Sequence, residues 1–599
     1  MTTPSTIPEL VEESARRFGP KVAYQMKVGS GYQRLTFDEL AQRSREFGAG
    51  LLATGMRRGD RVAIVSENSL DWIVGYYGLS MAGGVGVPLY SELKGSEIQD
   101  LVRRSDARYV IASRAVIGRL PDRLPGVEAV IVAGRDVKDG AASPSGGAVG
   151  FDAVAAAGTD ESRRMVRSTQ VSSGDLASIV FTSGTMGGAK GVMLTHGNFT
   201  ADVESVRRAL PIQSSDRMLT VLPLHHALPF TVGLLAFTSL GVETTLENDL
   251  TRLRDRMQET KSTLFGGVPA LFKLMYRAIT RQLEAEGKLG QFQRAVQIVD
   301  RVKRATGLNI GPLVFRPLHR RLGGHLRFIV SGGAALDPEI ARDYLRLGLP
   351  IIQGWGLTET APVVSVQRWN AAKYLFTRHY ERRAGSVGPP LPGVDVAVLD
   401  DAGDSPRISS HGEGELLVRG PNVFLGYYKE PELTREAKVG DWFRTGDLGR
   451  IDGERNVWIT GRVKSVIVLE SGKKVIPDRI EDLVTPDPLI ESICVLPLQV
   501  GARTVVGAVV HPAFSETNEA CREKGLPLNE DCIRMLLKER LSRLDARLDL
   551  HERVSELVVS DTPLPQTPLG KVARGRVEIP HSFDLERWER NFHQAEFSN

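Results

Sequence analysis

The segment FTSGTMGGAKGVMLTHGN, residues 181–198, continues a short apolar run, ASIVFTSG (177–184), of the kind that forms a buried strand. Three hydroxyl residues and three glycines precede a lysine, Lys190. Backbone N–H groups, hydroxyls and an ammonium in such a loop can bind polyphosphate oxygens, and glycine permits positive φ angles. The spacing is not that of a Walker loop, because no GK[ST] follows at the required distance. The segment therefore predicts another type of phosphate site, with a plain serine- and glycine-rich turn as the alternative.

Four similar apolar runs lie beside helical patterns elsewhere in the chain. They are RVAIVSE (61–67), RYVIASR (108–114), EAVIVAG (128–134) and RFIVSGG (327–333). Strands that alternate with helices predict an α/β fold with a mainly parallel sheet, helices on both faces and right-handed crossovers. Residues 136–150 are small and polar, which predicts an exposed loop.

After about Gly385 the pattern changes to short alternating strands separated by Gly and Asp turns. The strands are expected in VDVAVLDDAGD, GEGELLVRG and RNVWITGR, which together predict an antiparallel β subdomain. The rest of the chain predicts a small α+β domain with strands in SICVLPL and TVVGAVVHP and a helix over 532–548. We therefore predict two domains, residues 1–462 and 463–599.

The composition excludes several classes of protein. Of 599 residues, 42% are hydrophobic and 25% charged, which is typical of a globular chain, and a net charge of +4 does not indicate a nucleic-acid partner. Cys494, Cys521 and Cys532 show no paired spacing, so neither a disulfide framework nor a zinc site is predicted, and a reducing cytoplasm fits best. Residues 72–91 and 218–242 lack charged side chains, but their glycines, prolines and histidines favour buried helix and strand over a membrane span.

FTSGTMGGAKGV closely resembles the phosphate loop of the acyl-adenylate-forming superfamily, with Met186 and Ala189 as departures from the usual Thr and Pro. Further motifs of that superfamily follow in the same order: SGGAAL (331–336), GWGLTET (354–360), DWFRTGDLG (441–449) and ITGRVKSVI (459–467). Each alone could be a turn with a solvated charge. The resemblance implies phosphate contacts from Thr182, Ser183, Gly184, Thr185, Lys190 and Thr358, adenylate contacts from Gly333, Ala334, Gly354, Trp355 and Gly356, ribose or phosphate contacts from Asp447 and Arg462, and Mg²⁺ ligands in Glu359 and Thr182.

Two more segments match the superfamily at positions that would act on the acyl group. LPLHHALPF (222–230) places His226 between an acyl tunnel and the adenylate, with a packed core histidine as the alternative. LPQTPLGKVARG (564–575) resembles the loop that carries one catalytic lysine, here Lys571, which would bridge the acyl carboxylate and the α-phosphate. Thr358, His226 and Lys571 are thus the implied catalytic residues.

The resemblance also implies a domain rotation between two half-reactions. Lys464 matches the hinge, although an exposed linker lysine is the alternative, and the SGKK loop (471–474), with Gly472, would then move to a thiol tunnel. Ser465 and Arg479 depart from the usual acidic residues near this hinge. The C-terminal domain is therefore expected to be mobile.

Within the superfamily, FGGVPALFKLMYRAI (265–279) and GELLVRGPNVFLGYYKEPELT (414–434) most resemble long-chain fatty-acid CoA ligases. Gly266 and Gly267 are candidates for the wall of the acyl tunnel, with a tight turn as the alternative. The expected activity is ATP-dependent conversion of a fatty acid, through acyl-AMP, to acyl-CoA. A fatty acyl-AMP ligase, an aryl or medium-chain CoA ligase and a non-catalytic lipid or nucleotide sensor are the alternatives.

The implied partners are a fatty acid, ATP with Mg²⁺, and coenzyme A, without nucleic acid. LGGHL (322–326) imitates a carrier-protein motif, but Leu326 replaces the serine that would carry phosphopantetheine, so no carrier domain is expected. A homodimer and peripheral contact with a membrane stay open. The run YLFTRHYERR (374–383) is the candidate for that contact, and a solvated loop is the favoured alternative.

Overall fold

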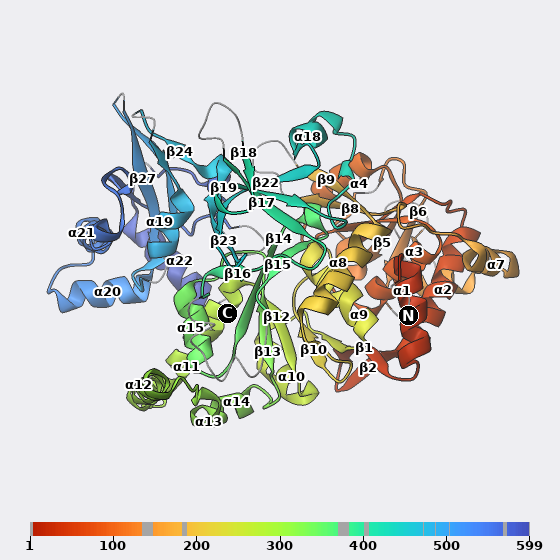
Figure 1. The fold of residues 1–599 in the computed structure, drawn as a ribbon, viewed down its shortest axis with the longest axis horizontal. Coiled ribbons are helices and arrows are strands. Elements are labelled where there is room, and N and C mark those ends of the chain that lie inside the picture. The colour runs from red at the N-terminus through yellow and green to blue at the C-terminus, as the bar shows by residue number, and fades with distance from the viewer. Residues whose placement is uncertain are drawn as a thin grey trace. The chain divides into compact units, whose positions relative to one another are not determined.

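The computed structural model shows an α/β chain (Figure 1). The structure describes residues 4–121, 123–134, 148–182, 189–368, 383–400, 407–470, 473–484, 487–501, 503–566, 572–580 and 582–597. The chain divides into two compact units. The first comprises Met1–Val396, Leu417–Arg444 and Glu454–Val457, and the second comprises Ala397–Leu416, Thr445–Gly453 and Trp458–Asn599. The boundary between residues 462 and 463 stays a prediction.

One sheet of the first unit contains the strand that precedes the predicted phosphate loop. Its order is β20-β9-β8-β4-β3-β5-β6-β7. Neighbours from β8 to β7 are parallel, whereas β9 runs antiparallel to β8 and β20 antiparallel to β9. The strands are β3 (Arg61–Val65), β4 (Val85–Leu89), β5 (Ala107–Ser113), β6 (Ala129–Ala133), β7 (Ala148–Gly150), β8 (Leu176–Thr182), β9 (Lys190–Thr195) and β20 (Gly426–Tyr427).

The strand predictions for this sheet are confirmed at β3, β5, β6 and β8. The prediction of a loop over residues 136–150 is wrong at the C-terminal end of that range, because Ala148–Gly150 pairs with β6 as an edge strand. Residues 136–147 lie outside the described residues. Short edge strands of this kind have few apolar positions, so composition does not distinguish them from loops.

The second sheet of the first unit has the order β15-β14-β13-β12-β10-β11-β1-β2. Its neighbours are parallel except for β15 and β2, which run antiparallel to β14 and β1. The parallel strands therefore end at one common edge, where ligands bind in open α/β sheets. The strands are β1 (Val22–Val28), β2 (Gly31–Thr36), β10 (Arg217–Thr220), β11 (Glu243–Leu246), β12 (Leu264–Gly267), β13 (Phe328–Ser331), β14 (Ile351–Gly356) and β15 (Val363–Val366).

Helices connect these strands, and the two uncharged stretches are buried as predicted. Helix α3 (Leu70–Met81) begins at Ser69, whose hydroxyl accepts from the Trp72 N–H, and every α3 residue except Asp71 is buried. No helix of the described ranges is long and apolar enough to cross a membrane. The other helices of the first unit are α1 (Ile7–Phe18), α2 (Phe37–Ala53), α4 (Gly95–Ser105), α5 (Arg114–Ile117), α6 (Phe151–Ala156), α7 (Asp160–Ser168), α8 (His196–Ala209), the π-helical η1 (Pro229–Ala236), α9 (Phe237–Leu240), α10 (Leu253–Thr260), α11 (Pro269–Ala285), α12 (Leu289–Thr306), α13 (Gly311–Val314), α14 (Arg316–Arg321), α15 (Pro338–Arg346) and α18 (Pro431–Glu436).

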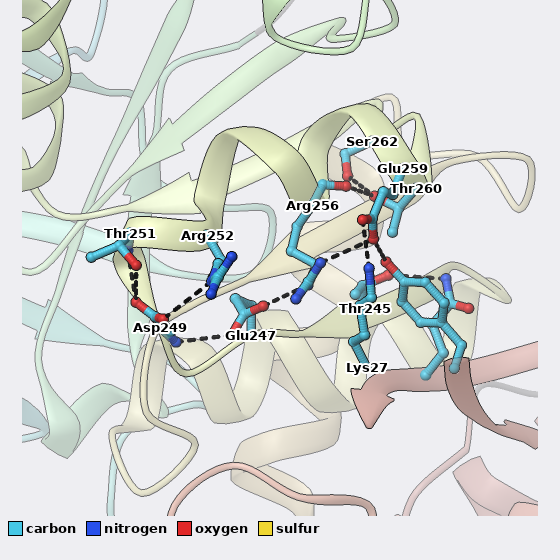
Figure 2. A network of polar contacts seen from close by, with 12 residues as sticks. Lys27, Thr245, Glu247, Asp249, Thr251, Arg252, Arg256, Glu259, Thr260 and Ser262 are labelled. Atoms are coloured by element: carbon cyan, nitrogen blue, oxygen red, sulfur yellow. Dashed lines mark hydrogen bonds and ion pairs between the residues drawn. The ribbon is translucent and has the colours of Figure 1, made fainter. Parts of the chain in front are cut away.

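A polar network fixes α10 to the edge of the second sheet (Figure 2). Arg256 on α10 forms ion pairs with Glu247, which follows β11, at 2.6 Å and with Glu259 at 3.0 Å. The Glu259 carboxylate also accepts from Lys27 Nζ and from the Tyr32 hydroxyl, each at 2.6 Å. These two hydrogen bonds lower the pKa of Glu259 to about 2. The carboxylate therefore stays ionised and links α10 to the β1–β2 hairpin.

A third sheet follows the change of pattern after Gly385. Its order is β16-β23-β22-β19-β17-β18, with β21 beside β22. The predicted strands in VDVAVLDDAGD, GEGELLVRG and RNVWITGR are confirmed as β17, β19 and β23. The strands are β16 (Ser386–Gly388), β17 (Asp395–Asp400), β18 (Arg407–Ser409), β19 (Gly412–Arg419), β21 (Lys438–Val439), β22 (Trp442–Ile451) and β23 (Val457–Arg462).

The second unit has its own hydrophobic core, which includes Ile480, Ile533 and Trp588. Strand β27 pairs antiparallel with β26 and parallel with β28, which confirms the predicted strands in this part of the chain. The predicted helix over 532–548 ends earlier, at Ser542. The elements are β24 (Ile467–Val468), β25 (Lys474–Val475), α19 (Pro477–Val484), β26 (Ile490–Val500), β27 (Arg503–Pro512), α20 (Phe514–Glu523), α21 (Glu530–Ser542), β28 (Glu556–Val559) and α22 (Leu585–Phe597).

The cysteine prediction is wrong in one respect. Cys521 on α20 and Cys532 on α21 form a disulfide, and both are buried in the core of the second unit. Cys494 is a buried free thiol. The spacing of Cys521 and Cys532 matches no framework, and the packing of α20 against α21 brings them together. The argument from cysteines for a reducing compartment therefore no longer holds.

Candidate functional site

The predicted phosphate loop connects two antiparallel strands. Strand β8 ends at Thr182 and β9 begins at Lys190, and these two residues are direct cross-strand partners. Both side chains are half-buried. Ser183, Gly184 and Thr185 lie outside the described residues. The structure thus brings a hydroxyl and an ammonium together at the two ends of the loop.

Glu359, the predicted magnesium ligand, lies in the short helical turn η3 (Thr358–Thr360) after β14. The Tyr427 hydroxyl donates to Glu359 Oε1 at 2.9 Å, and the Phe424 N–H donates to the Glu359 main-chain oxygen at 2.8 Å. Lys190 Nζ lies 4.9 Å from the centre of the Tyr427 ring. One tyrosine therefore contacts both the predicted metal ligand and the predicted phosphate-binding lysine.

Tyr427 is the residue of this site that sequence reasoning missed. It occurs in GYYKEPELT, a segment with two adjacent tyrosines and no feature that separates them. Burial, followed by the charge of Glu359, raises the pKa of the Tyr427 hydroxyl well above its usual range. The hydroxyl consequently stays protonated and serves as a donor.

The predicted adenylate residues lie at the carboxyl ends of neighbouring strands. Ser331 at the end of β13 pairs with Gln353 of β14, so Gly333 and Ala334 follow one strand where Gly354 continues the next. Gly333 has φ +81° and is exposed, and Ala334 is half-exposed, so the backbone there is accessible. This arrangement suits the flat face of a base lying against the main chain.

Gly356 and Trp355 also have structural roles in β14. A Cβ on Gly356 would lie 1.8 Å from the Pro362 main-chain oxygen, so no side chain fits at this position. Trp355 is buried, with 9% of its surface exposed, and pairs with Ser365 across the antiparallel β15. Thr358, which follows, is half-buried.

His226 follows β10 beside a second histidine. The rings of His225 and His226 lie 4.1 Å apart, with His225 buried and His226 half-buried. Burial lowers the pKa of His226 to about 4 and that of His225 to about 2. Both imidazoles are therefore neutral at pH 7. This suits a gate, meaning a side chain between the acyl tunnel and the adenylate, or a packed core histidine, and does not suit a cationic role.

The space beside Gly266 and Gly267 is occupied by side chains. A Cβ on Gly267 would lie 2.8 Å from the Phe272 ring and 3.1 Å from Leu271, and one on Gly266 would lie 3.0 Å from Met218. Phe272 is itself fully buried. These contacts favour the alternative, a close approach of the backbone to its neighbours, at Gly267, and the passage for an alkyl chain beside the glycine pair stays a prediction.

In the second unit, the structure pairs the two predicted ribose residues with each other. Arg462 Nε lies 2.6 Å from Asp447 Oδ1, with Asp447 buried and about half of the Arg462 side chain exposed. Lys464 lies in the turn η4 (Val463–Ser465) and is exposed. Gly472 and Lys571 lie outside the described residues.

The residues that flank Lys571 are held by backbone contacts and a half-buried ion pair. Gln566 and Val572 form an antiparallel bridge, and the Ala573 N–H donates to Pro565 O at 2.7 Å. Arg574 Nη2 donates to Glu481 Oε1 of α19 at 2.7 Å, and the same oxygen accepts from the Val495 N–H at 2.7 Å. Burial raises the pKa of Glu481, and the Arg574 charge opposes that shift.

Comparison with known proteins decides the family. The model of the AMP-binding enzyme family matches residues 11–428, and that of the AMP-binding enzyme C-terminal domain matches residues 464–586. The chain belongs to the AMP-binding enzyme family. The superfamily resemblance predicted from the motifs is thereby confirmed.

Relatives of this AMP-binding enzyme include a long-chain-fatty-acid–CoA ligase, FadD15, from Mycobacterium bovis, which is 31% identical over 522 residues and covers 84% of this chain and 81% of that protein. Long-chain-fatty-acid–CoA ligase 6 of Rattus norvegicus is 30% identical over 486 residues, 78% of this chain and 68% of that protein. The fold matches a Mycobacterium tuberculosis fatty acyl CoA synthetase (TM-score 0.62, 22% identity, 95% of this chain and 96% of that chain). It also matches the anthranilate CoA ligase AuaEII (TM-score 0.71, 20% identity, 96% of both chains).

Proposed function

We propose that this AMP-binding enzyme is an AMP-forming long-chain fatty-acid CoA ligase. A carboxylate oxygen of the acid attacks the α-phosphorus of ATP, and the bond to pyrophosphate breaks. The thiol of coenzyme A then attacks the acyl carbonyl, loses its proton and displaces AMP. The observation that carries the proposal is that Tyr427 contacts both Glu359 and Lys190, and it supports the proposed roles of this carboxylate toward a metal ion and of this ammonium toward phosphate. The names of the relatives support the substrate class.

Roles follow from the chemistry of each side chain. Lys190 and the Thr182 hydroxyl would bind phosphate oxygens, and Thr358 would contact the α-phosphate. Glu359 and Thr182 offer a carboxylate and a hydroxyl oxygen, hard ligands that fit Mg²⁺, which usually takes only one or two carboxylates from protein. When bound, the ion would neutralise charge on the triphosphate. Asp447 and Arg462 would contact the ribose, His226 would act as the gate, and Lys571 would stabilise charge during adenylation.

The test is fatty-acid-dependent exchange of labelled pyrophosphate into ATP. We expect exchange with long-chain acids that requires Mg²⁺, followed by acyl-CoA formation when coenzyme A is added. A panel from short to long and aromatic carboxylates that gave no exchange would remove the enzymatic function. Exchange without acyl-CoA formation would instead favour an acyl-AMP ligase that uses a carrier protein.

We also propose peripheral contact with an anionic membrane, through α12–α14. Residues 289–321 hold seven Lys and Arg residues and one Asp, and Arg294, Ile298 and Arg301 share one exposed face of α12. Ile298 is 51% and Leu313 77% exposed. The run 374–383, the candidate for this contact from the sequence, lies outside the described residues except for Arg383. We expect sedimentation with phosphatidylglycerol vesicles that Arg301→Glu weakens, and equal binding to neutral vesicles would contradict this.

A further inference from the structure

Tyr427 contacts two side chains of opposite charge through two different parts of its own side chain. Its hydroxyl donates to Glu359 Oε1 at 2.9 Å, while the Lys190 ammonium lies 4.9 Å from the ring centre. The face of an aromatic ring attracts a cation, and a neutral hydroxyl donates well to a carboxylate. The same residue can therefore orient the carboxylate and the ammonium without being charged itself.

The backbone around Tyr427 forms hydrogen bonds with the strand that begins at Lys190 and with the main chain of Glu359. Strand β20 pairs with β9, the strand that begins at Lys190, and the Tyr428 N–H donates to Gly191 O at 2.7 Å. Three residues before Tyr427, the Phe424 N–H donates to Glu359 O, and the rings of Phe424 and Tyr427 pack edge to face at 4.9 Å. The ring is thus held in place by hydrogen-bonded backbone on one side and by aromatic packing on the other.

We propose that Tyr427 is a positioning residue of the nucleotide–metal site, with its hydroxyl orienting Glu359 toward a divalent cation and its ring holding Lys190 beside the phosphate loop. The inference rests on the proposed function for the roles of Glu359 and Lys190. A carboxylate that is already oriented loses less side-chain entropy when a cation binds, so removal of the hydroxyl weakens cation binding.

The neighbouring tyrosine provides a matched control. The Tyr428 hydroxyl donates to Asp106 Oδ2 at 2.7 Å, and Lys429 Nζ lies 5.3 Å from the Tyr428 ring centre. Tyr428 therefore makes the same two kinds of contact, with a carboxylate and a lysine outside the proposed site. Tyr428→Phe removes an equivalent hydrogen bond one residue away and leaves the proposed site unchanged.

The first test compares Tyr427→Phe with Tyr428→Phe. Phenylalanine keeps the ring for Phe424 and Lys190 and removes only the hydroxyl, and thermal melts check that both variants fold. For Tyr427→Phe we expect the Mg²⁺ concentration at half-maximal pyrophosphate exchange to rise about tenfold, because a hydrogen bond to a charged group is lost. The exchange rate at saturating Mg²⁺ should change much less. Tyr427→Leu should also raise the KM for ATP, because Lys190 loses the ring.

A binding measurement separates this inference from the proposed function. The Kd of Mn²⁺ in the presence of a non-hydrolysable ATP analogue should rise about tenfold in Tyr427→Phe and stay unchanged in Tyr428→Phe. In the Glu359→Gln background, Tyr427→Phe should add almost nothing, since the hydroxyl acts through that carboxylate. Equal Mn²⁺ affinity in Tyr427→Phe and the wild type, or full additivity with Glu359→Gln, would overturn the inference. Absence of fatty-acid-dependent exchange in the wild type would overturn the proposed function alone.

Discussion

Replacement of Lys571 by alanine should slow adenylation by about 10²–10³, the usual effect of removing one donor that stabilises developing charge. The fatty-acid carboxylate and the α-phosphate are both anionic, so their approach depends on a cation that lies between them. Thioester formation from supplied acyl-AMP should be much less affected, because that step does not bring a fatty-acid carboxylate and the α-phosphate of ATP together. Pyrophosphate exchange and acyl-CoA formation from synthetic acyl-AMP measure the two half-reactions separately.

Lys538→Ala is the control for loss of a lysine charge. Lys538 is exposed on α21 in the second unit, and we expect both half-reactions to keep their wild-type rates in that variant. Equal damage to the two half-reactions by Lys571→Ala would contradict a role confined to adenylation. It would also remove the main argument for a C-terminal domain that rotates between the steps.

Replacement of Glu481 by alanine should destabilise the second unit by about 3 kcal/mol, the lower end of the range for breaking a buried ion pair. Arg574 would lose its 2.7 Å partner and keep the more distant carboxylate of Asp478 at 3.7 Å, and the Val495 N–H would lose its acceptor. About a fifth to a quarter of the two paired side chains is exposed, which places the effect at the lower end. Denaturant unfolding measures the loss, and the Val495 amide should exchange its hydrogen faster.

Two variants make this measurement specific. Glu481→Gln keeps an acceptor oxygen and should lose less stability than Glu481→Ala. Glu539→Ala removes a carboxylate whose partners, Lys524 and Arg543, are exposed, and it should cost much less stability than Glu481→Ala. A loss in Glu481→Ala no larger than that in Glu539→Ala would show that the Arg574 contact does not stabilise the second unit.

The sequence predicted those elements whose signal is local. The apolar runs that became β3, β5, β6, β8 and β13 are buried, and their composition alone identifies them. Order along the chain was enough to identify the family from several short motifs. By contrast, the two-residue strand β20 has no periodicity to detect, and the contact between Tyr427 and Glu359 joins residues far apart in the chain.

Other features depend on what fills the space around a residue. In the sequence, a glycine pair is equally compatible with an open passage and with a ring packed against it. Only the structure shows that the ring of Phe272 packs against Gly267. The disulfide between Cys521 and Cys532 likewise needs the approach of α20 and α21. The pairing of Asp447 with Arg462 has the same origin, since adjacent strands in the sheet bring them together.

In many phosphate-binding loops the length of the loop is coupled to the stability of the helix that follows it. The antiparallel pairing of β8 and β9 removes that coupling. Where a loop leads from a strand into a helix, the helix N-terminus supplies part of the attraction for the anion, so a change in loop length disturbs the helix. Here the chain returns as a strand, and the pairing of Thr182 with Lys190 fixes both ends of the connection. A change in the length of this connection therefore leaves no helix N-terminus to be displaced at Lys190, where β9 begins. We therefore expect substitutions at Met186 and Ala189, where the chain departs from its superfamily, to leave the pairing of β8 with β9 intact.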